Sequence, residues 1–174
     1  MNGKPQTIVT SRLQLRAFEE KDAPAAIRIF MNQEVAKTYM LPDFASSEAA
    51  RPLFDRLRQL SLAEDRFVYG IYQGETLVGF LNDVDKTDRF LELGYVIHPD
   101  HKGQGFATEA LTACVEALFD MGYQAVRAGA FAENPASMRV MEKSGMARIQ
   151  LREQIEYRGI IHDCVYYEIE KAPV

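Results

Sequence analysis

Apolar and polar residues follow two different periods along this chain, and each change of period marks an expected element. Residues 8–16 alternate between apolar and polar positions, which predicts a strand. Residues 22–31 and 46–60 instead repeat their apolar residues every three or four positions, which predicts two helices. Residues that commonly cap helices stand at both starts: Asp22, followed by Pro24, and Ser46 or Ser47.

The period returns to two in the middle of the chain. Strands are expected over residues 66–72, 76–85 and 90–97, and Gln73-Gly74-Glu75 supplies a hairpin turn between the first two. Pro99 ends the third strand, because proline has no N–H to donate to a ladder.

The last part of the chain mixes both periods. Helices are expected over residues 105–121 and 135–144, and Gly122 stops the first of them. Three more strands complete the pattern: residues 124–131, 147–153 and 163–170. Because strands and helices interleave, we expect an α/β (α+β) fold with a mixed central sheet of about seven strands and about four helices. No repeat, low-complexity stretch or linker divides the chain, so residues 1–174 are expected to form a single domain.

Composition narrows the class of protein. The 174 residues contain no apolar run long enough for a transmembrane helix, and the amino terminus lacks the apolar stretch of a secretory signal. A cytoplasmic protein without a membrane partner is therefore expected. The net charge is -5 and no basic stripe is interleaved with aromatic residues, which argues against a nucleic-acid partner. A mildly acidic surface suits a basic substrate such as an amine.

The cysteines and histidines predict no metal site. Cys114 and Cys164 are far apart in sequence and match no metal-finger spacing, so we expect two buried thiols in a reducing compartment. His98 and His101 flank a turn, and two histidines at that spacing on a loop do not make a metal set.

A glycine loop offers the first candidate chemistry. Lys102-Gly103-Gln104-Gly105-Phe106-Ala107 follows a strand and runs directly into a helix. Two glycines around one residue allow a tight turn that directs N–H groups inward, and the first N–H groups of a helix lack partners. The helix dipole adds partial positive charge, so the loop predicts a site for a phosphate or pyrophosphate, with Lys102 beside it. A loop that only ends a strand and starts a helix stays open.

Known phosphate loops fit this segment poorly. A dinucleotide fingerprint requires a third glycine where Thr108 stands, and the nucleoside-triphosphate loop motif is absent. A second strand-to-helix junction lies downstream, where Asn134 is the expected N-cap or ligand contact and Gly145 the stop. Ligands of open sheets bind where strand ends diverge, so two such junctions predict a binding crevice.

Three segments together resemble a known family. The run from Leu93 to Ala110, LGYVIHPDHKGQGFATEA, resembles the acetyl-CoA motif of the GNAT N-acetyltransferase superfamily. With residues 10–16 and 134–145, the chain is similar to the branch that contains the ribosomal-protein N-terminal (RimJ/RimL-like) acetyltransferases. The segments occur in the family's order and cover nearly the whole chain, which is far more specific than any one motif.

The resemblance implies a splayed sheet of the acyl-CoA N-acyltransferase fold, with acetyl-CoA between the two diverging central strands. It also implies the residues that bind this co-substrate. Backbone groups of Tyr95, Val96 and Ile97 would face the pantetheine and thioester. The pyrophosphate would lie on the glycine loop: Lys102, Gly103, Gln104, Gly105, Phe106, Ala107 and Thr108. The other side of acetyl-CoA would be lined by Asn134, Ser137 and Lys143.

Two positions depart from the family's usual pattern. Lys102 stands where Arg or Gln is common; lysine keeps the charge but loses the planar fork, so the backbone amides must do most of the binding. Met141 stands where many relatives carry a tyrosine acid, and methionine has no proton to donate.

The resemblance implies direct attack of a primary amine on the thioester, with a protein N-terminal α-amine among the acceptors. Glu92 is the candidate general base, because it alternates onto the same side of its strand as Gly94. Ser137 is the candidate hydrogen-bond donor to the departing thiolate. A solvated strand glutamate and a plain helix serine are the structural alternatives. Further residues expected near the acceptor are unranked: Asp83, Asp85, Glu153 and Tyr157.

Other functions remain open at this point. The acceptor is alternatively a small amine: a polyamine, an aminoglycoside or an amino acid. Outside catalysis, the alternatives are a CoA-binding module and a phosphate-binding structural domain. A homodimer through the last strands is compatible with the resemblance, and fold and cofactor do not identify the second substrate.

Overall fold

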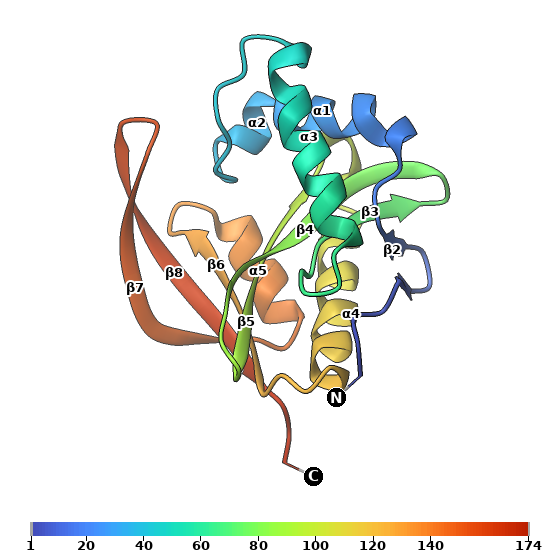
Figure 1. Ribbon diagram of the computed structural model, residues 1–174. Helices are drawn as coiled ribbons and strands as arrows, with labels where there is room; N and C mark the ends of the chain where they lie inside the picture. The colour runs from blue at the N-terminus through green and yellow to red at the C-terminus, as the bar shows by residue number, and fades with distance from the viewer. Residues whose placement is uncertain (1, 174) are drawn as a thin grey trace.

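A computed structural model describes residues 2–173 and contains one eight-stranded mixed sheet (Figure 1). The strand order is β1-β2-β3-β4-β5-β6-β8-β7, and every neighbouring pair is antiparallel except β5 and β6. The strands are β1 (Thr7–Val9), β2 (Gln14–Arg16), β3 (Tyr69–Gln73), β4 (Thr76–Lys86), β5 (Phe90–Ile97), β6 (Ala125–Phe131), β7 (Ala147–Tyr157) and β8 (Ile160–Glu170).

Helices cover both faces of the sheet. The α-helices are α1 (Ala23–Phe30), α2 (Gln33–Ala36), α3 (Ser47–Leu62), α4 (Phe106–Asp120) and α5 (Pro135–Lys143), and short 3-10 turns span Glu20–Asp22 and Pro99–His101. One core joins the sheet to α4 and α5, and a second joins its other face to α1 and α3. Cys114 is buried in the first core and Cys164 near β7, both as free thiols, as expected. Within residues 2–173, no helix is long and apolar enough to cross a membrane.

The expected α/β fold is confirmed, with local differences. The strand expected over residues 8–16 is two short strands, because the chain turns back at Thr10, whose backbone N–H donates to the Leu13 carbonyl. Helix α2 was not expected; Asn32 caps it by accepting from the N–H groups of Glu34 and Val35. The sheet therefore has eight strands and the chain five α-helices.

The expected helix starts are mostly confirmed by their caps. The Ser46 hydroxyl accepts from the N–H of Ala49, and the Asn134 side chain accepts from the N–H of Ser137. Asp22 precedes α1 as expected, yet its side chain does not cap that helix. The buried carboxylate instead accepts from the Tyr72 hydroxyl, at 2.7 Å, and from the N–H of Glu19, at 2.7 Å.

The sheet opens between β5 and β6. Their parallel pairing runs only from Phe90 with Ala125 to Leu93 with Ala128. Beyond Gly94, β5 continues along β4, whereas β6 beyond Ala128 continues along β8. The two strands diverge, and β7 and β8 lean away as a long hairpin at one side of the molecule (Figure 1). The sheet is thus splayed at its centre, as expected.

Candidate active site

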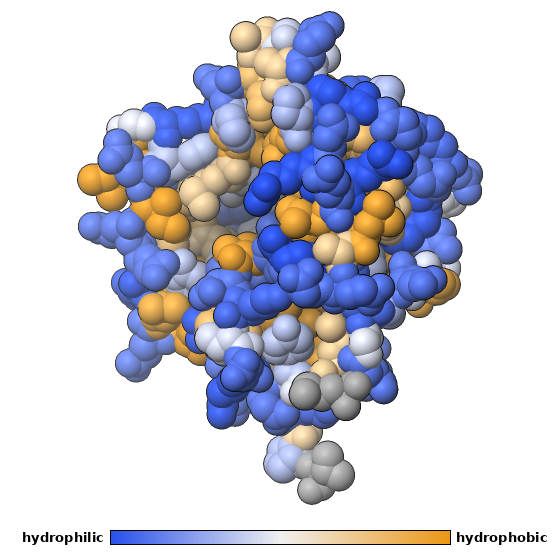
Figure 2. All heavy atoms as spheres, viewed as in Figure 1, coloured by the Kyte–Doolittle hydropathy of each residue, from blue (hydrophilic) through white to orange (hydrophobic). Residues whose placement is uncertain are grey.

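A cavity of about 490 Å³ lies where β5 and β6 separate. It extends between the starts of α4 and α5, and the segment that contains α2 forms its far wall. The expected residues that line it are Tyr95, Val96, Ile97, Lys102, Gly103, Gly105, Phe106, Ala107, Thr108, Asn134, Ser137 and Lys143. Gln104 is not among the lining residues. In the space-filling view, the surface is hollowed on the left, below the upper helices and beside the β7–β8 hairpin (Figure 2).

The glycine loop has the geometry of an anion site. Gly103 and Gly105 have φ values of 76° and 80°, which side-chain-bearing residues rarely adopt. Gly105 is the N-cap of α4 and offers no side chain to the helix start. In the described part of the chain, the backbone N–H groups of residues 103–108 donate to no protein acceptor. Unpartnered donors and the positive end of the helix dipole therefore face the cavity together.

The rim of this cavity is basic, although the chain carries a net charge of -5. Four cationic side chains line it: Lys37, Lys102, Arg139 and Lys143. Among residues 2–173, the one carboxylate that lines it is Glu34, which is paired with Lys37 at 2.7 Å. A ligand with several phosphates fits this charge distribution better than a neutral ligand does.

The backbone of β5 presents alternate residues to the opening. The His98 N–H donates to Val78 of β4 at 2.8 Å, and the Val96 carbonyl lies against Gly79 of β4. Because peptide groups alternate along a strand, the N–H and C=O groups of Tyr95 and Ile97 point away from β4, into the opening. Of the three expected residues, these two have free backbone groups there.

Tyr95 and Ser137 meet on the α5 side of the cavity. Their hydroxyl oxygens are 2.7 Å apart, and the Asn134 side chain accepts from the Ser137 N–H at 3.3 Å. Burial raises the pKa of Tyr95 to about 12, which the Ser137 hydrogen bond partly offsets. Tyr95 is therefore a neutral hydroxyl donor at physiological pH.

Glu92 lies at the base of the opening, not in the cavity wall. It is half-buried beside Arg127 of β6 and Asp85 of β4. Burial raises the pKa of this carboxyl, Arg127 lowers it, and Asp85 and Glu153 raise it further, so that the net direction is upward. Such a carboxyl is a better proton acceptor near neutral pH than an exposed one.

Tyr39, which lines the cavity, pairs with Asn82 of β4, a contact that the sequence did not indicate. The Tyr39 hydroxyl donates to the Asn82 side-chain oxygen. Both lie against Gly94, where an added Cβ would be 3.4 Å from Asn82 and 3.7 Å from Tyr39. Burial raises the pKa of Tyr39, so its hydroxyl remains protonated. The two residues stand in a loop and in a strand interior, and neither position carries a local motif.

The β7–β8 hairpin is joined to the wall that contains α2. The Tyr157 hydroxyl donates to the Ala36 carbonyl at 2.6 Å and accepts from the Leu41 N–H at 3.2 Å. Arg158 lies 3.5 Å from Asp43 in the same segment. The turn at residues 157–159 therefore holds residues 36–43, which include Tyr39, in place.

Met141 is completely buried in the first core and lies outside the cavity lining. It packs in the core between α5 and the sheet, so the Met141 side chain does not reach the cavity. Methionine also has no proton to donate, so Met141 supplies no acid there.

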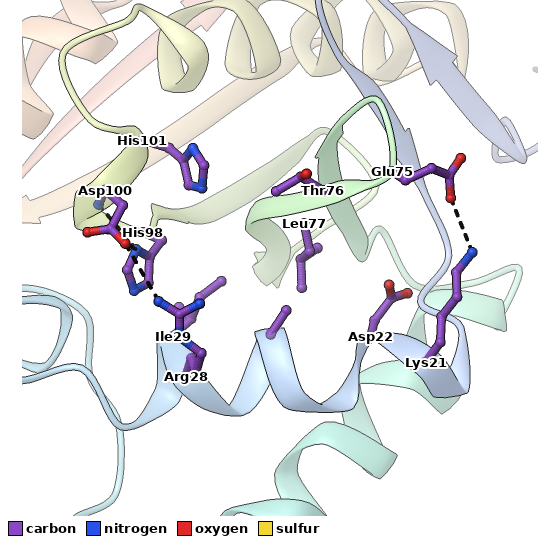
Figure 3. A pocket seen from close by; sticks show the side chains of 11 residues that line it. Lys21, Asp22, Arg28, Ile29, Glu75, Thr76, Leu77, His98, Asp100 and His101 are labelled. Atoms are coloured by element: carbon purple, nitrogen blue, oxygen red, sulfur yellow. Dashed lines mark hydrogen bonds and ion pairs between the residues drawn. The ribbon is translucent and has the colours of Figure 1, made fainter.

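A second cavity, of about 330 Å³, lies between α1 and the turn that joins β3 to β4 (Figure 3). Its charged groups pair with one another: Lys21 with Glu75 at 3.2 Å, and Arg28 with Asp100 at 3.6 Å. His101 lines both cavities. Within residues 2–173, no group of three or more histidine, cysteine or acidic side chains is placed to hold a metal ion.

Residues 12–147 match the family model described as an acetyltransferase (GNAT) domain. The chain is 31% identical over 168 residues to the uncharacterized N-acetyltransferase YoaA of Bacillus subtilis (strain 168), and the match covers 93% of this chain and 95% of that relative. A GNAT-family acetyltransferase structure from Bacillus anthracis is 26% identical, with a TM-score of 0.81, over 94% of this chain and 98% of that one. RimL, a ribosomal alpha-N-protein acetyltransferase solved in complex with coenzyme A, shares the fold at a TM-score of 0.79 and 20% identity, over 97% and 98%.

Proposed function

Because this chain belongs to the GNAT family of acetyltransferases, we propose that it transfers the acetyl group of acetyl-CoA to a protein N-terminal α-amine. The transfer of an acetyl group to an amine follows from the family. The donor, the acceptor and the residues that act on them are the proposal. The observation that carries it is the basic cavity in the splayed sheet, which ends on a loop of unpartnered N–H groups.

Acetyl-CoA fits the donor groups of the cavity. The N–H groups of residues 103–108 and the Lys102 side chain would hold the pyrophosphate. Arg139 and Lys143 supply further positive charge on the α5 side. The backbone groups of Tyr95 and Ile97 would form hydrogen bonds with the amides of the pantetheine arm. The arm would thereby take the place along β5 that β6 leaves after Ala128.

The chain's part in the reaction is to position the amine and accept its proton. Only a neutral amine attacks a thioester, and an α-amine with a pKa of about 7.8 is roughly one-tenth neutral at pH 7. Glu92, through water, would take the proton that the attacking nitrogen releases. A backbone N–H of β5 would stabilise the oxyanion, and the Tyr95–Ser137 pair would donate a hydrogen bond to the departing thiolate.

An α-amine is favoured over a lysine or polyamine on chemical grounds. A lysine amine with a pKa of about 10.4 is only roughly 0.04% neutral at pH 7, so it requires stronger proton removal or desolvation. In this opening the candidate base lies below the cavity wall and acts at a distance. RimL, which shares the fold, is a ribosomal L7/L12 alpha-N-protein acetyltransferase, and this supports the same acceptor class.

The test is a CoA-release assay with acetyl-CoA and three acceptor classes: peptides with free α-amines, polyamines and aminoglycosides. Turnover is expected with the peptides, and blocking the peptide α-amine should abolish it. Mass spectrometry of the product locates the added acetyl group. Turnover with small amines but not with peptides would show that the acceptor is a small amine and not a protein N-terminus. Tight CoA binding without turnover on any amine would identify a CoA-binding module instead.

A further inference from the structure

The turn between β1 and β2 lies against the start of α4, about 95 residues later in the chain. Arg12 in this turn makes three contacts there. Its Nη1 donates to the Gln104 carbonyl at 2.7 Å, inside the glycine loop. Its Nε donates to Glu109 at 2.7 Å, and its guanidinium lies 4.8 Å from the centre of the Phe106 ring. One side chain thus contacts the loop and the first turn of the helix together.

The negative charge of Glu109 is unfavourable for an anion bound at the start of α4, and the β1–β2 turn neutralises it. A carboxylate in the first turn of α4 is near the N–H groups that face the cavity, so its charge opposes a bound phosphate. Its oxygens accept from the Thr10 hydroxyl at 2.6 Å and the Arg12 N–H at 2.9 Å, besides the guanidinium. Burial raises the pKa of Glu109, but the hydrogen bonds from Thr10 and Arg12 outweigh burial and lower this pKa overall. The group therefore stays ionised and needs its counter-charge.

The Gln104 carbonyl matters for the shape of the loop. Gln104 lies between the two glycines of positive φ, and its carbonyl is held on the outer side by Arg12. A peptide whose carbonyl is fixed outward has the following N–H, that of Gly105, directed to the other side. Gly105 leaves room for this arrangement, because an added Cβ would be 3.4 Å from the Arg12 guanidinium.

We propose that Arg12 is a positioning residue for the donor substrate: it fixes the glycine loop through the Gln104 carbonyl and neutralises Glu109 beside the pyrophosphate. This inference rests on the proposed binding of acetyl-CoA to that loop. Arg12 is not itself one of the residues that line the cavity, and it acts through the loop and the first turn of α4, which do. The three separate contacts require the planar fork of arginine, and lysine at this position makes one of them at most.

The experiment measures CoA affinity by titration calorimetry, without catalysis, together with thermal unfolding and the KM values of both substrates. Arg12→Ala should raise the dissociation constant for CoA about tenfold, since it removes a charge-assisted hydrogen bond to the loop. The KM for acetyl-CoA should rise in parallel, while the KM for the amine changes by less than about twofold. Arg12→Lys should be intermediate.

The double variant Arg12→Ala/Glu109→Gln separates the two effects. It removes the uncompensated charge but leaves the Gln104 carbonyl free, so affinity should recover only in part. Arg89→Ala is the matched control, because Arg89 pairs with Glu170 at 2.7 Å on the exposed surface away from the cavity. It should leave both the dissociation constant and the KM values unchanged.

Three outcomes would overturn the proposal. Unchanged CoA affinity in Arg12→Ala and Arg12→Lys would show a role in stability alone, whatever the unfolding temperature does. An equal loss in Arg89→Ala would show a nonspecific effect of charge. If the unaltered protein binds no CoA, the proposed function fails and the role of Arg12 fails with it. Should Arg12→Ala not fold, Arg12→Lys and Glu109→Gln give the same comparison.

Discussion

At the scale of single residues, Glu92 is a half-buried carboxyl at the base of the opening, with Arg127 and two acidic groups around it. Its pKa lies above the ordinary value of 4.5, and its basic form is the deprotonated one. Activity should therefore rise as pH increases through this raised pKa. Glu92→Gln should lower kcat/KM on the order of 10²-fold and remove that acid limb from the pH profile.

Stability should move in the opposite direction. A carboxyl whose pKa is raised by folding destabilises the folded state as pH rises from the unfolded pKa through the folded one. At neutral pH the uncharged Glu92→Gln variant should therefore unfold at the same or a higher temperature. Glu156→Gln, at an exposed position of β7, is the control and should change neither property. If turnover and its pH profile survive Glu92→Gln, Glu92 has no part in proton transfer.

Local signals made some site residues predictable and left others hidden. The glycine loop was readable because positive φ and a helix start are encoded by adjacent residues. Tyr39 and Asn82 were not readable, since they are 43 positions apart and meet only through the packing of the α2 segment on β4. The distinction between Val96 and its neighbours also required the structure, because it depends on which edge of β5 faces β4.

At the scale of the elements, Gly103 in the loop before α4 can be compared with a second glycine of positive φ in another turn. Gly103 has φ 76° and Gly74, in the β3–β4 turn away from the cavity, has φ 57°, and an added Cβ at either position meets nothing within 4 Å. Alanine at either site should cost about 1–2 kcal/mol of stability through backbone strain. Only Gly103→Ala should also weaken CoA binding. The loop before α4 can relieve the strain at residue 103 by shifting its backbone, and this displaces the N–H groups that face the cavity.

The Gly103 variant can also be compared with a Lys102 variant, to rank the contributions of the loop backbone and of the lysine charge to CoA affinity. Calorimetric titration with CoA should show a larger loss of affinity for Gly103→Ala than for Lys102→Ala. The exposed Lys102 side chain contributes one screened charge, whereas the loop contributes several directed donors. The reverse ranking would mean that charge, and not backbone geometry, dominates at this helix start.

The hairpin β7–β8 acts on the opening through Tyr157. Tyr157→Phe removes the hydrogen bonds to Ala36 and Leu41 and should cost about 1 kcal/mol. Proteolysis and amide exchange within residues 36–41 should become faster, and the KM for the acceptor should rise. Tyr123→Phe is the control, because within residues 2–173 the Tyr123 hydroxyl makes no hydrogen bond to another residue. Unchanged amide exchange in residues 36–41 would contradict the role of Tyr157 in holding this segment in place.

Element boundaries were predictable where caps and periods agree and were shifted elsewhere. Ser46 and Asn134 stop the preceding chain by local hydrogen bonds, so the starts of α3 and α5 were readable. Strand β7 extends to Tyr157, beyond the expected end at residue 153, because it is exposed along most of its length and shows little apolar alternation. Its partner β8 determines its length.

For the molecule as a whole, the contrast between the basic cavity and the acidic chain predicts a salt dependence. The KM for acetyl-CoA should rise several-fold between about 0.1 M and about 1 M salt, since the screening length falls from about 10 Å to about 3 Å. Dephospho-CoA derivatives carry less charge and should show a weaker dependence. Equal salt sensitivity for both donors would mean that the charges of Arg139 and Lys143 do not act on the phosphate that dephospho-CoA lacks.

The short ladder between β5 and β6 has a thermodynamic consequence. In the described part of the chain, four residue pairs join β5 to β6, and beyond them the backbone groups of Tyr95 and Ile97 have no partner on the β6 side. A donor substrate that pairs with those groups binds the folded chain and not the unfolded one. At about 100 times its dissociation constant it adds about 2.7 kcal/mol to the free energy of unfolding. If the donor is acetyl-CoA, as proposed, the resistance of this protein to heat and to proteolysis should therefore report the supply of acyl-CoA around it.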